Sequence, residues 1–243
     1  MDSKPDQMPL VFVIADDPSV RESVEQLAAS AGWRAKAYEC AAEFLASPAA
    51  RVPSCLVLDI HLPDICGLEM QERVTRDRVE LPVVFVAGQS DVPTAVRAMK
   101  AGAVDFLTKP CDEGPLLQAI TSAIERSRTA LWNESQVREL KERYATLTPR
   151  ERQVMAGVTK GLLNKQVGFE LGISEITVKA HRGKVMEKMG ARSLPGLVEM
   201  TARLAAQISM ATRIACSSVH DRPSAQARSN AASSFNAPRA SAM

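Results

Sequence analysis

Three charged positions follow apolar runs of strand length. Asp16 and Asp17 follow LVFVIA, Asp59 follows CLVL, and Lys109 follows AVDFLT. Carboxylates crowded together repel one another unless a hard cation lies between them, and Mg²⁺ takes oxygen ligands from a few carboxylates while keeping water molecules. A lysine opposite them can hold a phosphoryl oxygen as a point charge. Metal, nucleophilic carboxylate and lysine are the groups that phosphoryl transfer to an aspartate requires.

The elements that would position these residues alternate between strand and helix. Segments with apolar residues at helical spacing separate five strand-like runs, at 10–17, 33–39, 55–61, 82–88 and 103–110. Runs this apolar favour a parallel sheet with both faces covered. The pattern predicts an α/β, flavodoxin-like, doubly wound domain with five parallel strands. The strand ends then meet at one edge, although any one of the charged residues could instead simply end its strand in solvent.

Composition indicates two domains with different partners. Of the 243 residues, 46% are hydrophobic and 24% charged, which is ordinary for a globular protein. Residues 10–125 hold 10 Lys and Arg against 17 Asp and Glu, whereas residues 148–200 hold 9 against 5. The excess of positive charge in residues 148–200 indicates that this half binds a polyanion.

Several classes of protein are disfavoured. No apolar run approaches the roughly 18 residues of a membrane span, and the N-terminal residues lack a signal-peptide pattern, so we expect a cytoplasmic protein without a membrane partner. The five cysteines are scattered without a C-x-x-C pair, which indicates neither a disulfide framework nor a zinc site. No strand is followed by G-x-G-x-x-G or a P-loop, so a nucleotide-binding enzyme is not indicated.

Residues 10–125 resemble a response-regulator receiver domain. The resemblance lies in the spacing of Asp16, Asp59 and Lys109, in DIHLPDICGLE, and in AVRAMKAGAVDFLTKP, which is especially close to the FixJ-type subgroup. It implies that Asp59 is the phosphoacceptor for a sensor histidine kinase. It also implies a Mg²⁺ ion bound by Asp16, Asp59 and the backbone carbonyl of His61. Lys109 would contact the phosphoryl group, next to a cis peptide bond to the following proline.

Three further positions bear on the switch that this resemblance implies. Phe106 occupies the aromatic switch position, although a core phenylalanine is an equally good reading. The first acidic residue of the family is replaced by Ala15, and the Thr or Ser that contacts the phosphoryl group is replaced by Ala87. Asp17 could replace the missing acid in part, but the replacement is not straightforward, because neighbouring strand residues point to opposite faces. An alternative is therefore a regulator that dimerises without phosphorylation.

The segment after the receiver reads as one long helix, whose part at 126–147 is a linker. It carries apolar residues three and four apart, but the run is short and contains an Asn, so we expect a weak coiled coil that pairs only when the receivers do. The positions of this seam are Ala130, Asn133, Val137, Leu140, Tyr144 and Leu147.

Residues 148–210 read as a small all-α domain with a helix-turn-helix. Thr148, Pro149 and Glu151 predict an N-cap, a first helical residue and a capping box. Gly161 ends that helix, and Ser174 caps a later helix that carries several cations. Two short helices joined through GIS are typical of a helix-turn-helix whose last helix enters a major groove. Charge alone does not distinguish a DNA-binding helix from one whose basic side chains simply face solvent.

The sequence shape of this domain is similar to the LuxR-type DNA-binding domain over roughly 50 residues, from LTPRERQVM to KVMEKMGARS. The resemblance places Lys179, Ala180 and Gly183 on the face that reads bases in double-stranded DNA. Residues better placed for phosphates are Asn164, Lys165, Thr177, His181, Arg182 and Lys184.

Together, these features predict a two-domain transcriptional response regulator that is not an enzyme, forms a homodimer on phosphorylation and has RNA polymerase as a possible partner. A phosphatase of the haloacid dehalogenase type also uses an Asp nucleophile, but it requires an Asp where His61 stands. The remaining predicted parts are an N-terminal extension, 1–9, and a disordered tail, 211–243.

Overall fold

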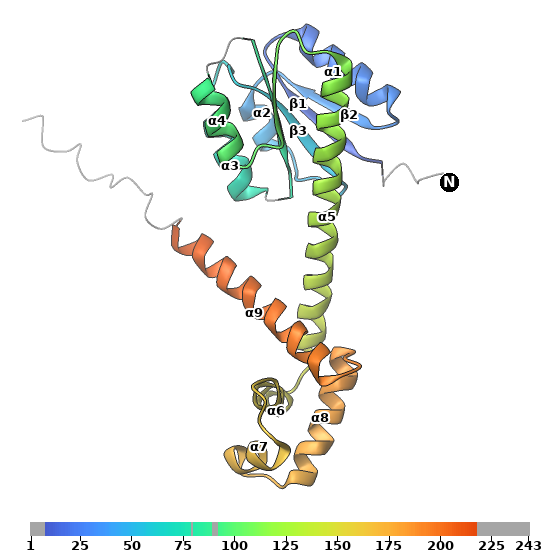
Figure 1. The fold of residues 1–243 in the computed structure, drawn as a ribbon, viewed down its shortest axis with the longest axis vertical. Helices are drawn as coiled ribbons and strands as arrows, with labels where there is room; N and C mark the ends of the chain where they lie inside the picture. The colour runs from blue at the N-terminus through green and yellow to red at the C-terminus, as the bar shows by residue number, and fades with distance from the viewer. Residues whose placement is uncertain (1–7, 79, 89–91, 218–243) are drawn as a thin grey trace, which may run out of the picture. The chain divides into compact units, whose positions relative to one another are not determined.

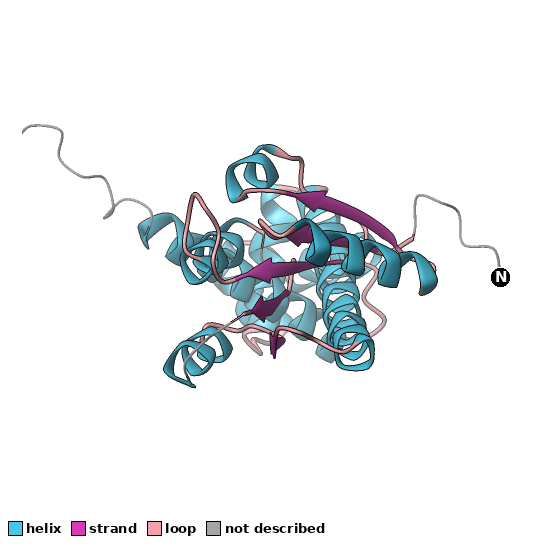
Figure 2. Cartoon of the chain, turned by 90° about the horizontal axis from the view of Figure 1, so that it is seen from above, coloured by secondary structure: helices cyan, strands magenta, loops and turns pink. Residues whose placement is uncertain are grey.

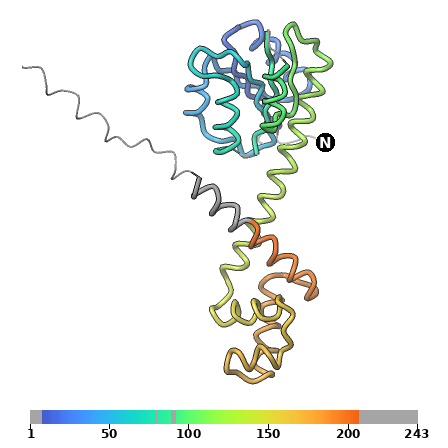
Figure 3. The backbone as a smooth tube through the Cα atoms, turned by 60° about the vertical axis from the view of Figure 1, so that its left-hand side comes forward, coloured from blue at the N-terminus to red at the C-terminus, as the bar shows by residue number. Residues whose placement is uncertain are grey.

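The structure, a computed structural model, describes residues 8–78, 80–88 and 92–217. The chain divides into two compact units between Arg152 and Gln153 (Figures 1 and 3). Most of the predicted N-terminal extension and residues 218–243 of the predicted tail lie outside the described residues. No helix in the described ranges is long and apolar enough to cross a membrane.

The first unit is built on the five-stranded parallel sheet that the sequence predicts. The strand order is β2-β1-β3-β4-β5, so the chain reverses its winding direction between β1 and β3. All four strand pairs are parallel, with Ile14 beside Leu58 and Ala87 beside Thr108 at the carboxyl ends. The flavodoxin-like fold class is thus confirmed. The strands are β1 Leu10–Ile14, β2 Arg34–Tyr38, β3 Ser54–Asp59, β4 Val83–Ala87 and β5 Asp105–Thr108.

Helices cover both faces of this sheet (Figure 2). Alternate residues of each strand point to opposite faces, so Phe12 and Val13 lie in separate apolar clusters. The cluster with Val13 is closed by α1, Pro18–Ser30, and by the first part of α5, Glu113–Ala145. The other cluster is closed by α2 Ala41–Ala46, α3 Gly67–Asp77 and α4 Val92–Lys100.

The predicted linker helix is the second part of α5, a single helix of 33 residues. The expected seam is not one continuous exposed stripe. Val137 and Leu140 are buried, whereas Asn133 and Tyr144 are exposed.

The helix-turn-helix region contains α6 Pro149–Thr159, α7 Asn164–Leu171 and α8 Glu175–Met189. The predicted capping box of α6 is present, because the Thr148 amide donates to Glu151 Oε2 at 2.9 Å and the Glu151 amide donates to Thr148 Oγ1 at 3.3 Å. Ser174 caps α8 as predicted, accepting from the Thr177 amide at 3.1 Å.

The last helix, α9, differs from the sequence interpretation. It spans Leu194–Ser217, so residues 211–217 of the predicted disordered tail are helical. Apolar residues continue three and four apart at Leu204, Ile208, Ala211 and Ala215, a spacing that favours continued helix over disorder.

Candidate acidic site and nucleic-acid interface

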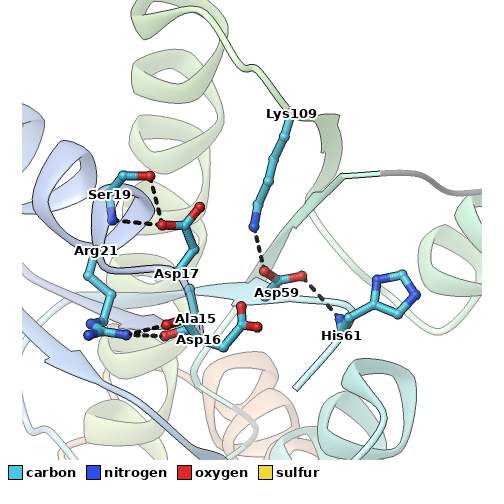
Figure 4. A network of polar contacts seen from close by, with 8 residues as sticks. All are labelled: Ala15, Asp16, Asp17, Ser19, Arg21, Asp59, His61 and Lys109. Atoms are coloured by element: carbon cyan, nitrogen blue, oxygen red, sulfur yellow. Dashed lines mark hydrogen bonds and ion pairs between the residues drawn. The ribbon is translucent and has the colours of Figure 1, made fainter. Parts of the chain in front are cut away.

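The acidic site lies at the carboxyl edge of the sheet, where the ends of β1, β3 and β5 bring Asp16, Asp59 and Lys109 together (Figure 4). Asp59 is the last residue of β3, and its side chain is only 4% exposed. Lys109 Nζ lies 2.5 Å from Asp59 Oδ2, and its side chain is 22% exposed. The Lys109-Pro110 peptide bond is cis, as predicted.

Asp59 has a donor for each of its carboxylate oxygens. Oδ2 pairs with Lys109, and Oδ1 accepts from the backbone amide of His61 at 3.0 Å. A charged acceptor with two donors keeps a defined orientation. The carboxylate therefore has a fixed orientation at the carboxyl edge of the sheet.

The two acids after β1 have different surroundings. Asp17 turns toward α1, where its Oδ1 accepts from the amide of Ser19 at 2.9 Å and from its hydroxyl at 2.8 Å. These hydrogen bonds lower the pKa of Asp17 below its ordinary value. Asp16 instead lies on the side of Asp59 in Figure 4, and its carboxylate is exposed, with no partner among the described residues. Asp17 is thus engaged as a helix cap and does not replace the acid missing at Ala15.

The surroundings of Asp16 and Asp59 fit a hard cation. Asp16 and Asp59 offer two carboxylates, and the backbone carbonyl of His61 would add a third oxygen, a set of ligands that suits Mg²⁺. The carboxylate of Asp16 offers free oxygens at the edge of the sheet. No group of three or more His, Cys, Asp or Glu side chains among the described residues is placed to hold a metal ion, so two carboxylates would leave several positions around the ion to water.

The two alanines of the site are fully enclosed. Ala15 is 1% and Ala87 0% exposed, and the carbonyl of Ala87 accepts from the Lys109 amide at 2.7 Å. The position of Ala87 is thus adjacent to the lysine but offers no hydroxyl. Phe106 is half-buried, with its ring 6.0 Å from that of Phe85.

Two features of the loop after Asp59 were not predicted from the sequence. A Cβ on Gly67 would lie 2.6 Å from the carbonyl oxygen of Asp59, so the loop and α3 pack too closely for any side chain there. Asp64 accepts from the amides of Ala41 and Ala42, at 3.2 and 2.9 Å. It caps α2, whose own N-cap residue, Cys40, makes no side-chain cap. A cysteine at this N-cap was the only local sign that another residue must supply the cap.

The helix-turn-helix is held tightly at its turn. Gly172 ends α7 with φ of 65°, a left-handed conformation that favours glycine. A Cβ on Gly168 would lie 2.7 Å from the carbonyl oxygen of Ile173. The close contact fixes α8 relative to α7, which is what a helix presented to a groove requires.

The predicted DNA-binding residues do not all have the same exposure. Lys179, Ala180 and Gly183 lie on the exposed face of α8, opposite Val178 and Val185, which are buried. Lys179 Nζ is 3.8 Å from the carboxylate of Glu175. Lys165 and Lys184 are exposed as well.

The other predicted phosphate contacts are partly engaged within the domain. Arg182 donates to Asn164 Oδ1 at 3.4 Å, and the hydroxyls of Thr177 and Ser174 are 2.8 Å apart. His181 is half-buried, and its Nδ1 is buried with no hydrogen-bond partner among the described residues. The structure therefore places His181 on the inner side of α8 rather than among the exposed cations.

Comparisons with known proteins agree with this arrangement. Residues 11–121 match the response regulator receiver domain, and residues 145–201 match the luxR family of bacterial regulatory proteins. The chain is 47% identical over 195 residues to nodulation protein W of Bradyrhizobium diazoefficiens, covering 80% of this chain and 86% of that protein. It is 39% identical to the transcriptional regulatory protein FixJ of the same organism, covering 79% and 94%. The solved structure of the response regulator StyR superposes with a TM-score of 0.71 at 41% identity, covering 81% of this chain and 99% of that one.

Proposed function

Since the chain belongs to the response regulators that join a receiver domain to a LuxR-type DNA-binding domain, we propose that a sensor histidine kinase phosphorylates Asp59 and thereby switches DNA binding. The observation that carries the proposal is the ion pair of Asp59 and Lys109 at the carboxyl edge of the sheet. It joins an oriented nucleophile to a cation that suits a phosphoryl oxygen.

The transfer itself needs little from the protein beyond position and charge. A carboxylate oxygen of Asp59 forms a bond to phosphorus while the bond from phosphorus to the kinase histidine nitrogen breaks, and that nitrogen keeps the electron pair. Lys109 then exchanges its contact with the carboxylate for one with the phosphoryl oxygens. Asp16, Asp59 and the carbonyl of His61 would hold Mg²⁺, which neutralises charge on the transferring group.

A donor can approach this site from the side of α1. A cavity of about 560 Å³ lies beside Lys109, lined by residues of α1 and by the segment that leads into α5. Its lining includes both polar side chains, such as Ser19 and Gln26, and apolar ones, such as Val20 and Leu116. This mixture fits an amphipathic helix of a partner protein.

A homodimer formed by α4 is the proposed result of phosphorylation. Val92, Val96 and Met99 are 76%, 43% and 44% exposed and follow helical spacing along α4. Three neighbouring exposed apolar side chains on one helix suit an interface with a second copy. In the dimer, two copies of α8 would meet two half-sites of double-stranded DNA, read by Lys179 and its neighbours.

The same site also favours a second reading, in which the receiver dimerises without phosphate. Ala87 offers no hydroxyl to the phosphoryl group, and Ala15 no carboxylate to the metal. Phosphorylation reorganises a receiver through contacts to the phosphoryl group and to the metal ion, and the lack of this hydroxyl and this carboxylate weakens both contacts.

We assign residues 10–125 to the receiver, 126–147 to the linker and 148–210 to the DNA-binding domain, with an N-terminal extension, 1–9. Because its partner is chromosomal DNA, the protein would act in the cytoplasm, where RNA polymerase is a further partner. Activity as an enzyme is not part of this role.

The test is DNA binding and sedimentation of the full chain with and without acetyl phosphate. Wild type should gain dimer and DNA affinity on treatment, and Asp59→Ala should gain neither. If both proteins respond alike, Asp59 is not the acceptor. If both are fully dimeric before treatment, the phosphate-independent reading is correct.

A further inference from the structure

One stripe along the exposed face of α8 carries a single lysine among apolar or small residues. Ile176, Lys179, Ala180 and Gly183 are spaced by three, one and three residues, so they lie along one stripe of the helix. Ile176 begins the stripe and is 80% exposed. A Cβ on Gly183 would meet no atom within 4 Å, so nothing in the described part of the domain covers the far end of the stripe.

The polar groups in the first turn of α8 are already engaged. Ser174 Oγ accepts from the Thr177 amide at 3.1 Å, and the two hydroxyls are 2.8 Å apart. The carboxylate of Glu175 is 3.8 Å from Lys179 Nζ and offsets part of its charge. Ile176 is therefore the side chain of this turn that projects without an internal partner.

We propose that Ile176 is a specificity-determining residue that reads thymine in each half-site. This inference rests on the proposed placement of α8 in the major groove. There, the C5 methyl of thymine is the apolar group that bases present, whereas the other edges offer hydrogen-bond donors and acceptors. An isoleucine on the reading stripe contacts that methyl and pairs with no polar edge. The operator should hence carry a thymine opposite the first turn of α8, beside the base that Lys179 contacts.

The chain offers a matched control for this role. Phe169 is 91% exposed, but it lies on α7, outside the reading stripe. Ile176→Ala and Phe169→Ala both remove an exposed apolar side chain, so neither should disturb folding. The two variants differ in whether the lost side chain faces the bases.

The experiment selects binding sites from a random DNA pool with the full chain treated with acetyl phosphate. Wild type and Phe169→Ala should select the same thymine in each half-site, and Ile176→Ala should lose it. In the selected site, deoxyuridine in place of that thymine removes only the methyl, and should weaken wild-type binding about fourfold per half-site while leaving Ile176→Ala unchanged.

The outcomes distinguish a failure of the role of Ile176 from a failure of the proposed role of α8 in reading bases. If Lys179→Ala changes the selected sequence and Ile176→Ala does not, α8 is the reading helix and the role of Ile176 is wrong. Should neither variant change the selected sequence, α8 does not read the bases, and the inference fails together with the proposed function of this helix. An equal deoxyuridine effect on wild type and Ile176→Ala also contradicts it.

Discussion

Lys109 Nζ lies 2.5 Å from Oδ2 of Asp59, so a nearly buried carboxylate depends on one lysine as its cationic partner. Removing the lysine while keeping the carboxylate leaves a charge with little access to water. Lys109→Met should lower the free energy of unfolding by about 1.5–3 kcal/mol, measured by urea denaturation. The double variant Asp59→Asn, Lys109→Met removes both charges and should recover most of the loss. An equally unstable double variant would show that the pair does not matter to stability.

The alanines at 15 and 87 are expected to weaken the phosphorylation switch. A hydroxyl at position 87 would add a hydrogen bond to the phosphoryl oxygens of about 1.5–3 kcal/mol, because one partner is charged. Ala15→Asp with Ala87→Thr should thus raise Mg²⁺ affinity and the phosphorylated dimer fraction, measured by magnesium titration and sedimentation. Ala15→Asp with Ala87→Val is the matched control, since valine has the shape of threonine without its hydroxyl. Equal dimer fractions in both variants would exclude a role for the hydroxyl.

Gly67 should tolerate no side chain. Its Cβ would meet the carbonyl oxygen of Asp59 at 2.6 Å and the Cα of Ile60 at 2.8 Å, both backbone atoms. Gly67→Ala should therefore shift the loop after Asp59, residues 60–66 (the acceptor loop), and lower the free energy of unfolding by about 1–3 kcal/mol in urea denaturation. Gly114→Ala, where the new Cβ meets nothing within 4 Å, serves as the control. Unchanged stability and phosphorylation in Gly67→Ala would mean that the backbone of the loop moves to accommodate the new Cβ at no energetic cost.

The cap at Asp17 makes stability depend on pH. Hydrogen bonds from Ser19 lower the pKa of Asp17 in the folded state, so its contribution is full above the unfolded pKa of about 3.9 and is lost as pH falls through the lower folded value. Asp17→Asn keeps a capping oxygen that does not titrate. The difference in urea midpoint between wild type and this variant should be constant above about pH 5 and change only in acid. A difference that varies between neutral pH and pH 5 would point to another group.

The two exposed lysines of α8 should differ in what their loss does to DNA binding. Lys179→Ala should cost about 1–3 kcal/mol on the specific site and relax sequence preference. Lys184→Ala should weaken binding to all sequences alike and reduce the salt slope by about one unit per protomer. Titrations on specific and scrambled DNA over a range of salt measure both effects. The same loss of preference in both variants would contradict these roles.

The strands and the meeting of Asp59 with Lys109 at one edge of the sheet could be predicted because their signals are local. Apolar runs ending on Asp59 and Lys109 mark strand ends, and parallel strands place those ends at one edge whatever the surrounding packing. The cap on α2 could not be predicted, since Asp64 contacts backbone amides 22 and 23 residues earlier in the chain. The half-buried position of His181 likewise depends on packing that its basic neighbours in the sequence do not reveal.

The contact between Asp64 and α2 gives the acceptor loop a natural spectroscopic reporter. The amides of Ala41 and Ala42 donate to the carboxylate of Asp64, five residues after Asp59, so a displacement of Asp64 relative to α2 would lengthen or break both hydrogen bonds. Their chemical shifts and exchange rates would follow the loop without an added label. These two backbone signals would thus record the state of Asp59 from a helix that makes no contact with the phosphoryl group.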